Sequence, residues 1–207
     1  MTVTVDCFYT AISPYAYLGH QAFVEMAARN GVSVRFKPVR LFGVFEQTGG
    51  VPLPKRHPAR LAYRWIELQR WREARGLPLN LKPAFWPADC SLADRAAILV
   101  AESGADAAAY VGKTLSIVWA EDKNIADEAV VAEALRETGH DAEAILEAVK
   151  AGKADAAYDA HTQEGADLGI IGSPCYVLNG EPFWGQDRIE LLESAIRSGR
   201  APFRPLS

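Results

Sequence analysis

Ser13 stands where an apolar strand is expected to end and a helix to begin, in the segment ISPYAYLGH at residues 12–20. Serine is a preferred helix N-cap, and Pro14 suits the first helical turn. The free N–H groups and positive dipole of a helix start also favour bound negative charge. Ser13 is therefore either a plain cap or a hydrogen-bond donor to an anion such as a thiolate. A hydrolase nucleophile is disfavoured, because no G-x-S-x-G motif surrounds Ser13 and the four histidines form no motif with it.

Pro174 follows a Gly-Ser turn at the start of an expected strand, in GIIGSPCYV at residues 169–177. A proline is tolerated at the first residue or edge of a strand and is a candidate for a cis peptide bond. This stretch alone favours a trans proline at a strand edge. The edge beside Ser173 could pair with the backbone of a ligand by strand addition.

The segment FWGQDRIELL at residues 183–192 places a carboxylate beside a cation at the start of the last expected helix. Asp187 either caps that helix, worth about 1 kcal/mol, or forms with Arg188 a charge pair for an amino-acid zwitterion. Trp184 could form an apolar wall. The segment itself does not decide between the two interpretations.

A basic segment, residues 55–76, holds seven Lys or Arg against two Glu. The spacing of Leu61, Trp65 and Leu68 predicts a packed helix face, with Arg60 and Arg64 on another. Such a run is usually a solvated surface. If it borders a pocket, Arg60 is suited to hold a substrate carboxylate in a bidentate fashion.

The elements that must position these residues fall into three groups. Residues 3–9 and 32–39 read as strands around a helix that ends at Asn30-Gly31. Residues 41–58, rich in Gly and Pro, are expected to be irregular, and six helices are expected near 59–75, 92–103, 105–121, 126–138, 141–151 and 153–168. Strands at 175–178 and 182–184 and a final helix from about 187 follow. This order predicts an α/β, thioredoxin-like fold interrupted by an inserted all-helical domain.

Composition limits the partners. Residues 1–87 carry 12 basic and 5 acidic residues and the remainder 10 and 21, so a local basic pocket for a small anion fits better than a nucleic-acid surface. The three cysteines, Cys7, Cys90 and Cys175, are far apart, which supports neither a metal site nor a disulfide framework. With no signal peptide or apolar run long enough to span a membrane, we expect a cytoplasmic protein.

Together these segments resemble the 2-hydroxychromene-2-carboxylate isomerase family, which is close to the kappa-class glutathione transferases and more distantly similar to DsbA-type oxidoreductases. The resemblance runs nearly end to end and rests on five motifs: FYTAISPYAYL, PARLAYRWIELQRW, LADRAA, GSPCYV at the cis-proline position, and FWGQDRIELL. It implies a thioredoxin-like glutathione-binding domain of residues 1–45 and 168–207. Residues 46–167 would form the helical domain that covers the substrate pocket.

The resemblance also implies roles for individual residues. Ser13, the catalytic residue, would donate a hydrogen bond to the sulfur of the cofactor glutathione, and Ser173, before Pro174, would pair with its cysteinyl backbone. The γ-glutamyl end would be surrounded by Trp184, Gly185, Gln186, Asp187 and Arg188. Three positions match those that face the aromatic substrate: Glu46, Arg60 and Tyr63. The implied reaction is ring opening of the chromene acid and isomerisation to a benzylidene pyruvate, with a homodimer as the expected assembly.

Three residues depart from the family pattern, namely Glu46 in place of a lysine and Gly50 and Cys90 in place of asparagines. The charge reversal at Glu46 makes glutathione binding the firmer expectation and the small aromatic carboxylate, or another electrophile, the weaker one. Two alternatives stay open: a kappa-like glutathione transferase or peroxidase, and a non-catalytic thioredoxin-like binding protein. A disulfide oxidoreductase is disfavoured, because Ser13 and Ala16 stand where two cysteines are required.

Overall fold

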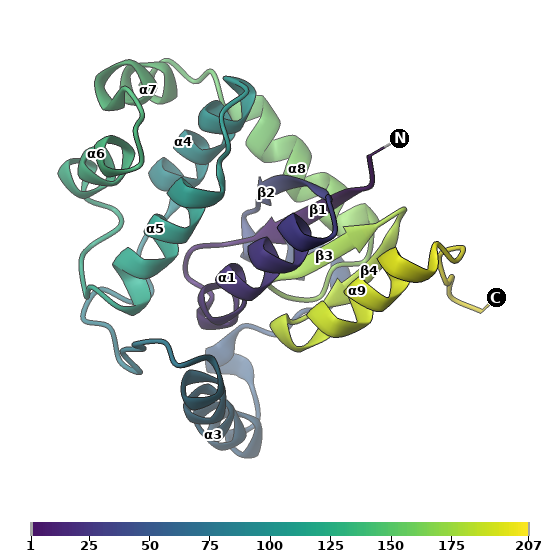
Figure 1. Ribbon diagram of the computed structural model, residues 1–207. Coiled ribbons are helices and arrows are strands. Elements are labelled where there is room, and N and C mark those ends of the chain that lie inside the picture. The colour runs from purple at the N-terminus through teal and green to yellow at the C-terminus, as the bar shows by residue number, and fades with distance from the viewer. Residues whose placement is uncertain (1, 207) are drawn as a thin grey trace.

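The computed structural model describes residues 2–206 and shows a four-stranded mixed sheet with helices on both faces (Figure 1). The strand order is β2-β1-β3-β4, in which β1 runs parallel to β2, and β3 is antiparallel to both β1 and β4. The strands are β1 (Thr4–Tyr9), β2 (Ser33–Pro38), β3 (Cys175–Leu178) and β4 (Glu181–Trp184). The two ends of the chain therefore build one sheet, as the order of elements predicts.

The helices that belong to the sheet and those between β2 and β3 occupy different places. In Figure 1, α1 and α9 lie in front of the sheet, α4 to α7 gather at the upper left, and α3 stands apart below. The helices are α1 (Pro14–Arg29), α2 (Leu41–Thr48), α3 (Pro58–Arg75), α4 (Ser91–Glu102), α5 (Ala108–Trp119), α6 (Glu128–Glu137), α7 (Ala142–Lys150), α8 (Asp155–Asp167) and α9 (Ile189–Ser198), with 3₁₀ turns at Leu53–Lys55 and Gln186–Arg188. The six predicted helices of the middle segment are confirmed within a few residues, whereas the proposed domain boundaries stay a prediction.

Side chains of β1 alternate between two apolar cores, because successive residues of a strand point to opposite faces. Val5, Cys7 and Tyr9 belong to the larger core, which α1, α4 and α5 complete. Phe8 faces the smaller core, built with Val44 of α2 and strand β3. Both faces of β1 are therefore buried, and this central strand is fixed from two sides.

The expectation of irregular structure over residues 41–58 is wrong for its first part, which forms α2. Val44 and Phe45 are buried, and Gly43 lies close to Thr162 of α8, so packing offsets the low helix propensity of one internal glycine. The helix ends at Gly49, whose φ of +77° is the left-handed conformation that favours glycine. The irregular, Gly- and Pro-rich part of the segment begins only at Gly49.

The predicted packed face of α3 is wrong in part. Leu68 is fully buried, but Trp65 keeps 38% of its surface exposed. The reason is that α3 stands away from the helical group and contacts mainly α1. Its remaining face is left free to border a cleft. No helix among residues 2–206 has the length and apolar character needed to cross a membrane.

Trp119 connects the helical group to the sheet. Its side chain is 1% exposed, and its indole Nε1–H donates a hydrogen bond of 3.0 Å to the carbonyl of Ala11, just after β1. The loop that leads to Ser13 is therefore held from α5.

We predict that Trp119→Phe lowers the free energy of unfolding by about 2 to 4 kcal/mol, because it leaves a cavity and an unpaired buried carbonyl. Urea denaturation measures this change. The matched variant Trp65→Phe, at a half-exposed tryptophan, is expected to shift it by about 0.5 kcal/mol or less. Equal effects of the two substitutions would contradict the role of Trp119.

Candidate functional site

Ser13 joins two segments of the chain that are 160 residues apart. Its Oγ accepts a hydrogen bond of 3.2 Å from the Ala16 N–H, which is the predicted N-cap contact of α1. The same hydroxyl donates a bond of 2.8 Å to the carbonyl of Ser173. The Ser173 Oγ in turn accepts a hydrogen bond of 3.1 Å from the Thr10 N–H. The capping role of Ser13 is confirmed, whereas its role as a donor to an anion stays a prediction.

The Ser173–Pro174 peptide bond is cis, as the resemblance implies and against the trans bond that the local stretch favours. The Pro174 carbonyl accepts a bond of 2.9 Å from the Gly185 N–H, which continues the β3–β4 ladder by one step. Within residues 2–206, the Ser173 N–H takes part in no hydrogen bond. This N–H is therefore available to an extended ligand, whereas the Ser173 carbonyl is occupied by Ser13.

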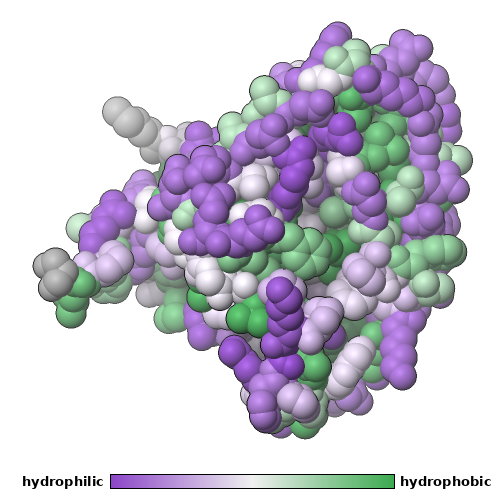
Figure 2. Space-filling model, turned by 180° about the vertical axis from the view of Figure 1, so that it is seen from behind, coloured by the Kyte–Doolittle hydropathy of each residue, from purple (hydrophilic) through white to green (hydrophobic). Residues whose placement is uncertain are grey.

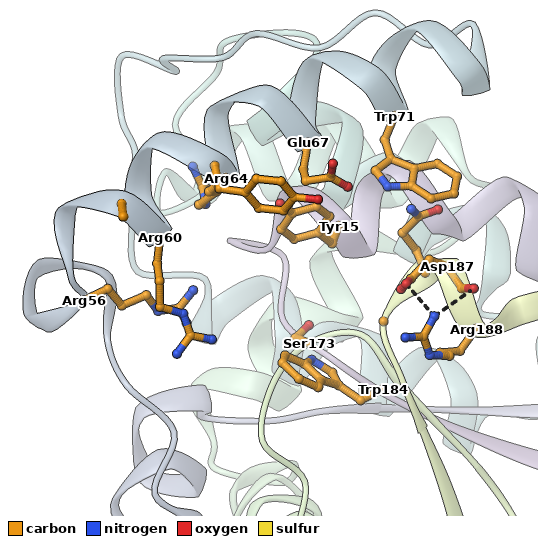
Figure 3. Close-up of a pocket in the computed structure, with 14 residues that line it drawn as sticks. Tyr15, Arg56, Arg60, Arg64, Glu67, Trp71, Ser173, Trp184, Asp187 and Arg188 are labelled. Atoms are coloured by element: carbon orange, nitrogen blue, oxygen red, sulfur yellow. Dashed lines mark hydrogen bonds and ion pairs between the residues drawn. The ribbon is translucent and has the colours of Figure 1, made fainter.

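Two adjoining cavities meet at Ser173. The first, here called the polar cavity, has a volume of about 520 Å³ and lies between α3 and the segment 184–188 (Figure 3). The second, the apolar cavity, measures about 360 Å³ and is walled by Phe42, Phe45, Trp86 and Trp184, with Ser13 on its border. The residues that line both are Tyr15, Arg56, Arg64, Ser173 and Trp184. Figure 2, from behind, shows hydrophobic residues gathered in the middle of a face that hydrophilic residues frame.

The far end of the polar cavity carries an ion pair. Arg188 Nη1 lies 2.6 Å from Asp187 Oδ2, and both side chains are nearly half exposed (Figure 3). Asp187 does not cap the final helix, because α9 begins at Ile189 and no side chain caps it. Gly185 has a φ of +105°, and a Cβ there would collide with the Asp187 carboxylate. Glycine is therefore needed to bring this pair to the cavity.

Gln186, only 1% exposed, is held from the opposite side of the cleft by Arg75 of α3. The Arg75 Nη2 and Nε atoms lie 2.8 and 3.2 Å from Gln186 Oε1. A guanidinium group can only donate, so this contact fixes the amide with its oxygen toward Arg75. The Nε2 donor is then left buried without a partner among the described residues. An acceptor on a ligand in the polar cavity would satisfy it.

The structure brings most of the predicted site residues together, but not all. Arg60 and Tyr63 line the polar cavity from α3, opposite the segment 184–188. Glu46 lies on an exposed part of α2 and lines neither cavity. From the same helix Phe42 and Phe45 face the apolar cavity instead. Gly50 lies against the Phe45 ring, where a Cβ would collide, so an asparagine could not take its place without moving that ring.

Tyr15, Arg56, Arg64 and Arg75 are among the lining or supporting residues that were not predicted. Burial raises the pKa of the Tyr15 hydroxyl, an effect that the nearby Arg64 partly opposes. Burial lowers the pKa of both Arg56 and Arg64. For Arg64 the sequence offered one signal. Its i, i+4 spacing from Arg60 places both side chains on one face of α3. Arg75 looks from sequence like any cation in a last helical turn.

Cys90 lies beneath the Ser13 loop in a buried polar chain. Its Sγ is 3.4 Å from Thr10 Oγ1 and 3.2 Å from Asp94 Oδ2. The Tyr158 hydroxyl donates a hydrogen bond of 2.8 Å to the same carboxyl oxygen of Asp94. Burial raises the pKa of Asp94 to about 7 and also raises that of the Cys90 thiol, which disfavours a thiolate. All three cysteines are free and buried. Among the described residues, no group of three or more His, Cys, Asp or Glu is placed to hold a metal.

Comparisons with known proteins agree with this architecture. A family model for DsbA-like thioredoxin domains matches residues 4–197. A 2-hydroxychromene-2-carboxylate isomerase of Pseudomonas putida is 31% identical over 195 residues, which cover 93% of each chain. A solved 2-hydroxychromene-2-carboxylate isomerase structure has a TM-score of 0.81 at 28% identity and covers 94% of this chain and 95% of its own. A probable DsbA oxidoreductase of Streptomyces coelicolor, at 20% identity, shares the fold with a TM-score of 0.75 and coverages of 99% and 94%. The predicted fold class is confirmed.

Asp94 makes stability depend on pH in a direction that can be tested. Its pKa rises from 3.8 to about 7 on folding, so the folded state binds the proton more tightly. The free energy of unfolding should therefore fall as pH rises from about 4 to about 7 and then level off. Asp94→Asn removes the titration while keeping an acceptor for Tyr158, and we expect it to flatten this slope in urea unfolding at about pH 5 and about pH 8. Asp167→Asn, an exposed control, should leave the slope as it is; an unchanged slope in Asp94→Asn would sink the assignment.

Proposed function

Since the chain belongs to the DsbA-like thioredoxin domain family and to the family of the 2-hydroxychromene-2-carboxylate isomerases, we propose that it is a glutathione-dependent isomerase. Its substrate would be 2-hydroxychromene-2-carboxylate or a close aromatic acid, opened and isomerised to the benzylidene pyruvate. The observation that carries the proposal is the position of Ser13, at the start of α1 and bonded to Ser173, where a polar and an apolar cavity meet. A tripeptide thiol and a planar electrophile would reach one another there.

The residues present fit glutathione at three points. The free Ser173 edge beside the cis proline suits an extended cysteinyl unit. The Asp187–Arg188 pair offers a carboxylate and a guanidinium to the amine and carboxylate of a γ-glutamyl group. The buried and unpartnered Nε2 of Gln186 lacks an acceptor that such a ligand has. These features support a peptide-like ligand in the polar cavity.

The hydrogen bond between Ser13 and Ser173 suggests how the site prepares the thiol. A hydroxyl has one proton, and Ser13 now gives it to the Ser173 carbonyl. A ligand N–H that takes over this carbonyl releases the Ser13 proton for a neighbouring sulfur. The N–H groups at the start of α1 add positive potential at the same place. Both effects favour a thiolate over a thiol.

The side chains of the apolar cavity then provide the surroundings that the reaction needs. When bound, glutathione supplies a thiolate that adds reversibly to a conjugated carbon of the substrate. Trp86, Phe42 and Phe45 exclude water from the space next to Ser13 and offer flat walls to a ring. The rotation that interconverts the isomers requires room, which the continuous cavities provide. Because the thiol is regenerated, free glutathione should be unchanged at the end of the reaction.

We predict that Ser13→Ala lowers kcat/KM for 2-hydroxychromene-2-carboxylate by about 10- to 100-fold, the loss expected for a hydrogen bond to a charged atom. It should also raise the pKa of bound glutathione, measured by thiolate absorbance in the ultraviolet. Ser198→Ala, which removes a hydroxyl bonded to Ala195 away from both cavities, is the matched control. No binding of glutathione by the wild type in calorimetry would overturn the proposal.

The product decides between the isomerase and its alternatives. Chromatography after the reaction should return the benzylidene pyruvate and all of the glutathione as free thiol. A glutathione adduct or glutathione disulfide would instead indicate a kappa-like transferase or peroxidase. Binding without any turnover would favour a non-catalytic thioredoxin-like protein.

A further inference from the structure

Three arginines on one side of the cleft have no acidic partner in the part of the chain that the structure describes. Arg56, Arg60 and Arg64 all line the polar cavity (Figure 3). Further along α3, Arg70 is paired with Glu67 at 2.6 Å, and at the opposite end of the cavity Arg188 is paired with Asp187. No carboxylate oxygen of residues 2–206 lies within 4.0 Å of the other three guanidinium groups. The cleft therefore holds an excess of positive charge at one end.

Two of these cations are also partly withdrawn from water. Arg56 and Arg64 are partly buried, whereas Arg60 is exposed. Burial lowers the pKa of Arg56 and of Arg64, and repulsion acts in the same direction, from Arg60 on Arg56 and from Arg56 on Arg64. A desolvated cation with like charges beside it is unfavourable unless an anion is bound. An acid group of a ligand would relieve this cost.

The same two arginines are the ones that reach the apolar cavity. Arg56 and Arg64 line both cavities, and Arg60 lines the polar one alone. The Arg64 guanidinium lies 5.8 Å from the Trp86 ring centre, which holds it against the aromatic wall. Tyr15 also lines both cavities, and within residues 2–206 no hydrogen bond engages its hydroxyl. Two cations and a phenol donor thus border a flat, apolar space.

We propose that Arg56 and Arg64, with the Tyr15 hydroxyl as a third donor, bind the carboxylate of the second substrate and select planar aromatic acids for the apolar cavity. This assignment rests on the proposed function and replaces the one suggested for Arg60, which lines the polar cavity but not the apolar one. It also explains how a carboxylate substrate is accepted although Glu46 stands where a lysine is usual. The positive charge is supplied from α3 and the preceding loop instead of from α2.

A carboxylate can also reach the cleft from a second source, because the glycyl end of glutathione is a carboxylate too. The polar cavity, which Arg60 faces, would hold that group. The two sources are separable, since one acid enters with the aromatic ligand and the other with the tripeptide.

The test uses calorimetry without glutathione, with 2-naphthoate and its neutral counterpart 2-naphthamide as probes. The wild type is expected to bind the acid about tenfold or more tightly than the amide. Arg64→Gln and Arg56→Gln should each reduce this ratio by about tenfold, and Tyr15→Phe should reduce it less. Arg60→Gln and the α3 control Arg70→Gln should keep it. Arg64→Lys retains the positive charge and should keep part of the acid-to-amide ratio. Comparison of the Lys and Gln variants separates the effect of lost charge from an effect on the fold.

Each other result overturns the assignment. Equal binding of acid and amide by the wild type, or no binding of either, removes the anion site. A ratio that falls in Arg60→Gln but not in Arg64→Gln moves the site to Arg60. A glutathione affinity that weakens in Arg64→Gln while the naphthoate ratio holds assigns the arginines to the glycyl carboxylate. A failure of the proposed function gives a different result. The protein then binds no glutathione but still prefers naphthoate to naphthamide.

Discussion

The hydrogen bond from the Ser13 hydroxyl to the Ser173 carbonyl is the contact on which the rest of the site depends. It ties the start of α1 to the residue before the cis proline, and Thr10 reinforces the junction by donating to Ser173 Oγ. Trp119 holds the same loop from α5 through the Ala11 carbonyl. Because Thr10, Ala11 and Ser13 are each held by a segment distant in sequence, a small hydroxyl is presented to the cleft in one orientation.

Charge is distributed so that the cleft is positive although the whole chain is negative. The acidic excess belongs to the later helices, where Glu121 and Glu137 pair with Lys113, and Glu128 with Lys150. On α3 and the loop before it, the three arginines that line the cleft, Arg56, Arg60 and Arg64, have no such partner among residues 2–206. An anionic ligand is therefore attracted to the cleft, even though the net charge of −4 would repel it from the protein as a whole.

The departures from the family pattern have different physical consequences. Cys90 takes part in a buried chain with Thr10, Asp94 and Tyr158, which supports the Ser13 loop from below. Gly50 makes room for the Phe45 ring in the wall of the apolar cavity. Glu46 points to neither cavity. A position that differs from relatives thus marks support, shape or an exposed surface here.

The sequence by itself determined the order of elements and the cap at Ser13, because these follow from local periodicity, turn chemistry and strand connection. That Ser173 and residues 184–188 belong to one site was implied only by the family resemblance. The sequence also placed Arg60 on a free face of α3. Only the tertiary structure decided that α2 forms, since its buried face depends on α8 and β3. Only it decided that Arg56 and Arg64 border both cavities, that Arg75 orients Gln186, and that Glu46 does not reach the cleft. These are contacts between segments far apart in the chain, and their distances depend on how helices pack rather than on any local pattern.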